Sequence, residues 1–253
     1  MPGTDVPGSN LQLGGVGRAL IFCFFETSFE AMYNRYVLIL CRQTRKTICL
    51  SGILGLILIS FGNAESVPVR ILFLGDSLTE GYGIAQEDAF PARVESDLRK
   101  QNYDVTAVNA GVSGSTTASA PGRLRWHLRA KPDILVLALG ANDGLRGVPV
   151  EEIRKNLTTT LDIAQKANLK ILLVGMKMPP NYGPEYARDF EAIFPSLARK
   201  YHVALVPFLL DRVAGERDLN LADGIHPNEK GHHVMAERMI QALKPMLAAK
   251  ARS

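Results

Sequence analysis

The sequence predicts one α/β domain in which helices cover both faces of a parallel β-sheet. From Ser66 onward, short apolar runs alternate with segments whose apolar residues recur every three or four positions. The runs do not alternate between apolar and polar residues, as expected for strands that are buried on both faces. Polar and glycine-rich segments follow the strands, and parallel sheets bind their ligands beyond the carboxyl ends of the strands.

Five runs carry the strand pattern. The first ends at Gly75 and the third at Gly140, and glycine is a common residue where a strand gives way to a turn. The fifth run ends at Pro207, which cannot donate to a sheet. The expected strands are Val67–Leu74, Val105–Asn109, Ile134–Leu139, Lys170–Met176 and Val203–Val206.

Helical periodicity fills the segments between the strands. Three prolines indicate where helices begin or end. Pro149 suits the first position of one helix, Pro195 should end or kink the next, and Pro245 should stop the last. The expected helices surround Phe90–Leu98, a short segment at Leu124 and Leu128, Val150–Ala164, Tyr186–Ile193 and Met235–Leu243.

Residues 1–64 are expected to lie outside this domain, which covers residues 65–253. Residues 41–64 have the pattern of a secretory signal: a basic segment, about 14 mostly apolar residues over Ile48–Phe61, and small residues at Gly62 and Ala64. Cleavage is expected after Ala64, with the domain periplasmic or secreted. An uncleaved membrane anchor is the alternative, although the apolar run is shorter than the roughly 20 residues that span a bilayer.

Charge and cysteine content exclude several classes. Residues 65–253 hold 24 Lys/Arg against 22 Asp/Glu, interspersed along the chain, so nucleic acid is not an expected partner. All three cysteines precede residue 65, so the domain has neither a disulfide framework nor a thiolate metal site.

Two short motifs at opposite ends of the domain supply a hydroxyl, an imidazole and a carboxylate. Ser77 follows the first strand in Gly-Asp-Ser-Leu, and Asp223 and His226 stand three residues apart before the last helix. A serine hydroxyl becomes a nucleophile when a histidine takes its proton and a carboxylate holds the histidine. Taken alone, a serine in such a Gly-Asp-Ser turn is more often a helix N-cap than a nucleophile.

Two further loops offer hydrogen-bond donors for an oxyanion. Gly111 follows the second strand, and its N–H could approach a reacting oxygen because no Cβ intervenes. Asn142 follows the third strand and carries a side-chain amide. Each also fits an ordinary turn. Together with the N–H of Ser77 they would form a three-donor oxyanion hole.

The remaining chemistry-bearing residues indicate no metal or nucleotide site. His127, His202, His232 and His233 are interpreted as surface or internally bonded histidines, and no HExxH spacing occurs. Glycines follow the first strand, but neither GxxxxGK[ST] nor a properly placed GxGxxG is present. No cofactor and no metal are expected.

Four segments in this order resemble the sequence blocks of the GDSL or SGNH hydrolase family. They are Gly75-Asp76-Ser77-Leu78, Gly111 after Asn109-Ala110, Gly140-x-Asn142-Asp143 and Asp223-x-x-His226. The stretches at 144–147 and 179–183 are similar to the bacterial arylesterase branch, which includes the periplasmic acyl-CoA thioesterase/protease/lysophospholipase. The resemblance implies a flavodoxin-like α/β/α sandwich with strand order 2-1-3-4-5.

The resemblance also implies roles for these residues. Ser77 would be the nucleophile, His226 the general base and Asp223 its orienting acid, with Ser77, Gly111 and Asn142 as oxyanion donors. We expect a monomeric esterase or thioesterase that acts on a small acyl ester or thioester. The alternatives are a carbohydrate O-acetylesterase and a secreted lipid-binding module without activity. Loop residues expected to line an acyl groove are Leu145, Met178, Pro180, Tyr182 and Ile225.

Overall fold

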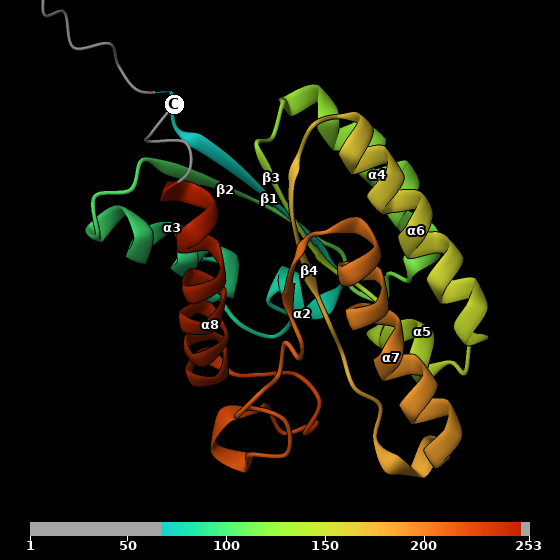
Figure 1. Ribbon diagram of the computed structural model, residues 1–253. Coiled ribbons are helices and arrows are strands. Elements are labelled where there is room, and N and C mark those ends of the chain that lie inside the picture. The colour runs from blue at the N-terminus through green and yellow to red at the C-terminus, as the bar shows by residue number, and fades with distance from the viewer. Residues whose placement is uncertain (1–66, 249–253) are drawn as a thin grey trace, which may run out of the picture. The chain divides into compact units, whose positions relative to one another are not determined.

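The computed structural model describes residues 67–248, all within the unit Glu65–Ser253. Five parallel strands form one sheet in the order β2-β1-β3-β4-β5, with helices on both faces (Figure 1). The α/β sandwich and its strand order are therefore confirmed. The expectations for residues 1–64 lie outside the described residues.

The strands form where the apolar runs predict them, with small shifts at their ends. β1 and β2 are paired along their whole length, so that Gly75 lies opposite Gly111 at the carboxyl edge. β1 starts and ends later than expected, β2 is two residues longer, and β4 is two residues shorter. Their bounds are β1 Val69–Gly75, β2 Val105–Gly111, β3 Ile134–Ala138, β4 Lys170–Val174 and β5 Ala204–Val206.

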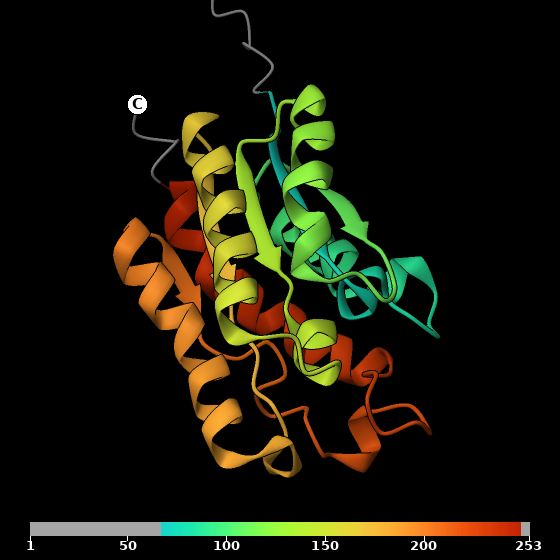
Figure 2. The same cartoon turned by 90° about the vertical axis from the view of Figure 1, so that its right-hand side faces the viewer.

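Helices α3 and α8 cover one face of the sheet, and α4, α6 and α7 cover the other (Figures 1 and 2). Each long helix buries one apolar stripe, as its periodicity predicts. The longer helices are α3 Phe90–Lys100, α4 Ala120–His127, α6 Val150–Lys166, α7 Pro184–Tyr201 and α8 Glu229–Ala248. Two short helices, α2 Ser77–Glu80 and α5 Ala141–Leu145, begin within three residues of the ends of β1 and β3.

The core lies between the sheet and its two helical layers. β3 is buried at every position, and Phe73, Phe90, Phe190 and Phe194 are fully buried. No helix among residues 67–248 is long and apolar enough to cross a membrane.

Neither Pro195 nor Pro245 ends its helix, contrary to expectation, and Pro149 lies one residue earlier than expected. Helix α7 continues through Pro195 to Tyr201, and α8 continues through Pro245 to Ala248. Both helices bury apolar side chains beyond the proline, among them Leu197 in α7 and Leu247 in α8, and this packing offsets the lost backbone hydrogen bond. Pro149 is the N-cap of α6, one residue before its first helical position.

Candidate active site

Ser77 is the first residue of helix α2, directly after β1. Its neighbour Asp76 caps this helix, since Asp76 Oδ1 accepts a hydrogen bond from the Leu78 N–H at 3.1 Å. The capping function that serine often has therefore belongs to Asp76, and the Ser77 hydroxyl is free to face the cavity beyond the strand. Gly75 permits the sharp strand-to-helix turn, because a Cβ there would collide with Thr79.

Ser77, His226 and Asp223 form one hydrogen-bonded chain. The Ser77 Oγ lies 3.0 Å from His226 Nε2, and His226 Nδ1 lies 2.7 Å from Asp223 Oδ2. A proton on Nδ1 would be donated to Asp223, which leaves Nε2 to accept the proton of the serine hydroxyl. Three side chains drawn together from opposite ends of the domain thus have the geometry of a nucleophile, a base and an orienting acid.

Hydrogen bonds to backbone groups of the same loop hold Asp223 and His226 in place. Asp223 Oδ1 accepts hydrogen bonds from the Ile225 and His226 N–H groups at 2.9 and 3.0 Å. The His226 carbonyl in turn accepts the Leu221 N–H at 2.7 Å. Hydrogen bonds from the His226 backbone and side chain and from the Ile225 backbone lower the pKa of Asp223 to about 2, so that the carboxylate is ionised at neutral pH.

Asp76 is a buried carboxyl at the same site. Burial raises the pKa of Asp76 to about 6, while its backbone hydrogen bonds and the charges of His226 and Arg123 act in the opposite direction. Arg123 reaches from α4 and donates to the carbonyl oxygens of Gly75 and Ala110, at the ends of β1 and β2. The strand ends beneath Ser77 are therefore joined by one guanidinium group.

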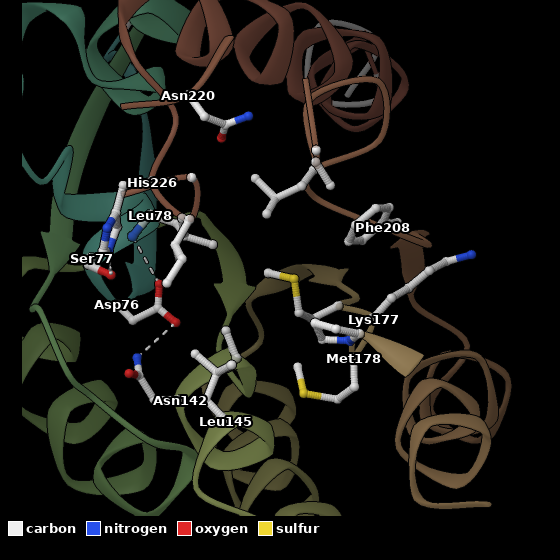
Figure 3. Close-up of a pocket in the computed structure, with 18 of the residues that line it drawn as sticks. Asp76, Ser77, Leu78, Asn142, Leu145, Lys177, Met178, Phe208, Asn220 and His226 are labelled. Carbon is white, nitrogen blue, oxygen red and sulfur yellow. Dashed lines mark hydrogen bonds between the residues drawn. The ribbon is translucent and has the colours of Figure 1, made fainter. Parts of the chain in front are cut away.

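Asn142 lies beside Asp76, at the start of α5. Its Nδ2 donates to the Ser115 carbonyl at 3.1 Å and lies 3.5 Å from Asp76 Oδ2, at the limit of a hydrogen bond (Figure 3). The structure therefore brings the Asn142 amide to the carboxyl end of the sheet next to Ser77.

Gly111 has a different environment. Its N–H donates to Asn109 Oδ1 at 2.9 Å, and the residue borders a separate hollow with Glu80 and Gln86. A Cβ at Gly111 would collide with the Glu80 backbone, so glycine here allows β2 to approach α2. In this arrangement the Gly111 N–H is already bonded and Gly111 does not line the cavity at Ser77.

The loop after β2 holds another glycine that sequence reasoning passed over. Gly114 has a φ of +75°, and its carbonyl accepts a hydrogen bond from Arg146. Its N–H has no acceptor among residues 67–248, whereas the next residue, Ser115, accepts from Asn142. Gly114 could have been noticed in the sequence because it stands in a Ser-Gly-Ser turn. The same turn holds the Asn142 side-chain amide through Ser115.

A cavity of about 740 Å³ opens at Ser77 and His226. Four of the five expected groove residues line it, namely Leu145, Met178, Tyr182 and Ile225; the side chain of Pro180 lies outside what the structure describes. Ser77 and His226 lie at one end, with Met178 and Phe208 away from them across the cavity (Figure 3). Apolar lining residues that were not predicted include Met176, Phe208 and Leu210.

The other histidines are separate from this chain of hydrogen bonds. His232 is buried, and its Nδ1 accepts the Phe90 N–H at 3.1 Å. His233 is exposed and lies 3.6 Å from Glu237. Among residues 67–248, no three His, Cys, Asp or Glu side chains gather in a way that could hold a metal ion.

One protein-family model matches most of the domain. The model of the GDSL-like Lipase/Acylhydrolase family matches residues 73–234, which include Ser77, Asn142 and His226. The chain belongs to this family. Its match covers every strand of the sheet except the first four residues of β1.

Curated proteins that are similar to this chain are named as esterases or thioesterases. The chain is 35% identical over 203 residues to "Esterase TesA" of Pseudomonas aeruginosa, which covers 80% of this chain and 100% of the relative. It is 35% identical to an arylesterase of Vibrio mimicus, covering 71% of this chain and 90% of that one. It is 34% identical to "Thioesterase 1/protease 1/lysophospholipase L1" of Escherichia coli, covering 77% and 91%. This GDSL protein is accordingly an ester hydrolase.

Solved structures share the fold. The crystal structure of TesA superposes with a TM-score of 0.68 at 36% identity, over 70% of this chain and 99% of that one. The SGNH-hydrolase esterase AlinE4 superposes with a TM-score of 0.60 at 40% identity, over 73% and 97%.

Proposed function

We propose that this hydrolase is a serine esterase or thioesterase in which Ser77, His226 and Asp223 act as a triad. The hydrogen-bonded chain Ser77 Oγ···His226 Nε2 and His226 Nδ1···Asp223 Oδ2, at 3.0 and 2.7 Å, carries this proposal. Asp223 is exposed for 39% of its side chain, but three hydrogen bonds hold it in place. The base is therefore oriented before substrate arrives.

The reaction proceeds through an acyl-enzyme. Ser77 Oγ bonds to the acyl carbon as its proton passes to His226 Nε2, and the carbon–oxygen or carbon–sulfur bond breaks as His226 protonates the departing alcohol or thiol. Water then gives a proton to His226 while its oxygen attacks the acyl carbon. The carboxylic acid leaves, and the proton returns to Ser77 Oγ.

The oxyanion is proposed to lie among N–H donors at the strand ends. The Ser77 N–H has no acceptor among residues 67–248, and the Asn142 amide would exchange its long contact with Asp76 for the oxyanion. We place the third donor at the Gly114 N–H, because that of Gly111 already donates to Asn109.

The cavity favours an acyl chain as the group that the enzyme recognises. Most of the surface that lines it is apolar, with Leu145, Met178 and Phe208 among the contributors. Polar side chains such as Lys177, Asn181 and Asn220 form the smaller part of the lining, whereas an acetylated sugar would need polar partners for each of its hydroxyl groups. Aryl esters, acyl-CoA thioesters and lysophospholipids all contain an acyl group that this cavity could receive.

Two measurements test the reaction. Ser77→Ala should lower hydrolysis of p-nitrophenyl butyrate by about 10³-fold or more, because the nucleophile is gone. A fluorophosphonate should label the wild-type protein at Ser77 and leave the variant unlabelled. Near-wild-type turnover by Ser77→Ala would refute the assignment, and an unlabelled wild-type protein would favour a binding module without activity.

A carbohydrate O-acetylesterase is the second candidate. The observation in its favour is a relative named "Acetylxylan esterase" of Xylanibacter ruminicola, 28% identical over 70% of this chain and 43% of that protein. Side-by-side kcat/KM values on acetyl-xylan and on esters and thioesters of increasing acyl length would separate the two. Faster turnover of acetyl-xylan than of every longer acyl substrate would favour the deacetylase.

We further propose that residues 41–64 are an export signal cleaved after Ala64 and that the domain acts as a monomer in the periplasm or outside the cell. N-terminal sequencing of the exported protein should begin at Glu65. Its mass in solution, measured by light scattering, should be that of one domain.

A further inference from the structure

The aromatic ring of Tyr82 packs against the imidazole of His226. The two ring centroids are 4.6 Å apart and the ring planes are inclined by 40°. Tyr82 does not line the cavity that Ser77 and His226 share, so it touches the histidine without facing the place of the substrate. This contact lies outside the Ser77–His226–Asp223 chain of hydrogen bonds.

The backbone ties Tyr82 to the nucleophile. The Ser77 carbonyl accepts hydrogen bonds from the N–H groups of Gly81 and Tyr82, both at 3.1 Å. Gly81 has a φ of +87°, which lets the chain turn back immediately after α2. The backbone of Tyr82 is thus held by the residue whose hydroxyl is the proposed nucleophile.

A second glycine brings the ring to the histidine loop. Gly83 has a φ of +79°, and a Cβ at this position would collide with the side chain of Leu221. Leu221 belongs to the loop of His226 and donates its N–H to the His226 carbonyl. Glycines on both sides of Tyr82 therefore allow its ring to reach the imidazole.

An exposed tyrosine in this position needs an explanation. The exposed fraction of Tyr82 is 51%, so its packing on His226 buries only part of the ring. A tyrosine face attracts a cation within about 6 Å of its centroid, and the proposed mechanism turns His226 into an imidazolium in the transition state. The ring would then stabilise a charge that is present only while the reaction proceeds.

We propose that Tyr82 is a positioning residue that holds the His226 ring and stabilises its protonated form during acyl transfer. This rests on the proposed role of His226 as general base. Tyr82 acts on the histidine alone, so its loss should lower kcat and leave KM unchanged.

Other groups also face His226 and bear on its charge. Asp223 contacts it through Nδ1, Ser77 through Nε2, and the charges of Asp76 and His232 interact with it. All of these remain in a Tyr82 variant, so any difference between variants reports on the ring at position 82.

A substitution series tests the proposal. Tyr82→Phe keeps the aromatic face and should retain wild-type kcat within about twofold. Tyr82→Leu keeps an apolar cover without the aromatic face and should lower kcat about two- to fivefold, with KM unchanged. The acid limb of its kcat/KM profile should also move to lower pH, because the protonated histidine is less favoured without the ring.

Trp126 provides a matched control. It is another exposed aromatic that packs on a histidine, with its centroid 4.7 Å from that of His127, and it lies on α4 away from the cavity. Trp126→Leu should leave kcat, KM and the pH profile unchanged. A similar loss in both leucine variants would overturn the proposal, since it would reflect general damage to the surface.

The outcomes separate the two proposals. If Ser77→Ala abolishes turnover but Tyr82→Leu matches the wild type in kcat and in the acid limb, the role of Tyr82 is refuted and the triad stands. If Ser77→Ala remains active, the proposed function fails first. If Tyr82→Leu has a lower melting temperature than the wild type, Tyr82→Trp is measured in its place. Wild-type kcat in Tyr82→Trp would support the proposal. A two- to fivefold loss of kcat in Tyr82→Trp would overturn it.

Discussion

Both carboxylate oxygens of Asp143 accept hydrogen bonds from one residue, Thr117. The Thr117 N–H donates to Oδ2 at 2.8 Å and its hydroxyl to Oδ1 at 2.6 Å, and both residues are buried. Asp143 follows Asn142 directly, and Thr117 belongs to the segment that holds Ser115, the acceptor of the Asn142 amide. The loop after β2 and the helix after β3 are therefore joined twice, immediately behind a proposed oxyanion donor.

Thr117→Val should weaken the connection between these two segments, because it removes one of the two Thr117–Asp143 hydrogen bonds. It removes the hydroxyl from a buried carboxylate, which typically costs about 1–3 kcal/mol of unfolding free energy. Because Asn142 then loses part of its support, we expect kcat to fall about tenfold with little change in KM. Urea denaturation and steady-state kinetics measure both.

Thr117→Ser is the matched control for this prediction, because it keeps the hydroxyl and the N–H. It should stay within about 1 kcal/mol of the wild type and retain its kcat. Equal kcat values for the valine and serine variants would show that this clamp does not support catalysis.

Asp223→Asn should preserve the loop and impair the base. The asparagine oxygen can still accept the Ile225 and His226 N–H groups, so stability should change little. An amide that donates toward Nδ1 would favour the wrong tautomer of His226, and kcat should fall about 10²–10⁴-fold. An Asp223→Asn enzyme with more than a tenth of wild-type kcat would contradict the role of this carboxylate.

Gly111→Ala should damage folding more than chemistry. The added Cβ meets the Glu80 backbone, and overpacking of this kind costs about 1–3 kcal/mol. If the oxyanion donor is Gly114, the turnover per fluorophosphonate-labelled site should stay close to that of the wild type. A fall of about 10²-fold per labelled site, without loss of stability, would instead assign the donor to Gly111.

The strands and the edge of the sheet that carries the site could be predicted from local sequence patterns. Continuous apolar runs identified the five strands, and parallel strands place their following loops at one edge. For that reason Ser77, Asn142 and His226, which are far apart in sequence, could be expected to meet.

The remainder depends on contacts between segments, which a single sequence does not display. Nothing in the pattern shows that the Asn109 side chain returns to the Gly111 N–H, or that Tyr82 packs on His226. The helices continue past Pro195 and Pro245 because tertiary burial outweighs a local preference. These contacts and helix ends depend on tertiary packing, whereas the order of strands and helices follows from the periodicity of the sequence.

His232 should make the folded state sensitive to acid. Burial lowers the pKa of His232 from 6.5 to about 4, with the charge of Arg93 acting in the same direction and that of Asp88 opposing it. A depressed pKa means that the unfolded chain takes up the proton first as pH falls. The contribution of this histidine to stability is therefore complete above about pH 6.5 and is lost between about pH 6.5 and 4, at up to about 3 kcal/mol.

His232→Asn tests this, since its side-chain oxygen can accept the Phe90 N–H without titrating. The stability of the wild type relative to this variant, from urea denaturation, should fall by up to about 3 kcal/mol between pH 7 and 4. Asp76, with its raised pKa, has the opposite trend between about pH 6 and 3.8, but it is present in both proteins and cancels in the difference. A difference between wild type and His232→Asn that is independent of pH would mean that this histidine is not buried in its neutral form.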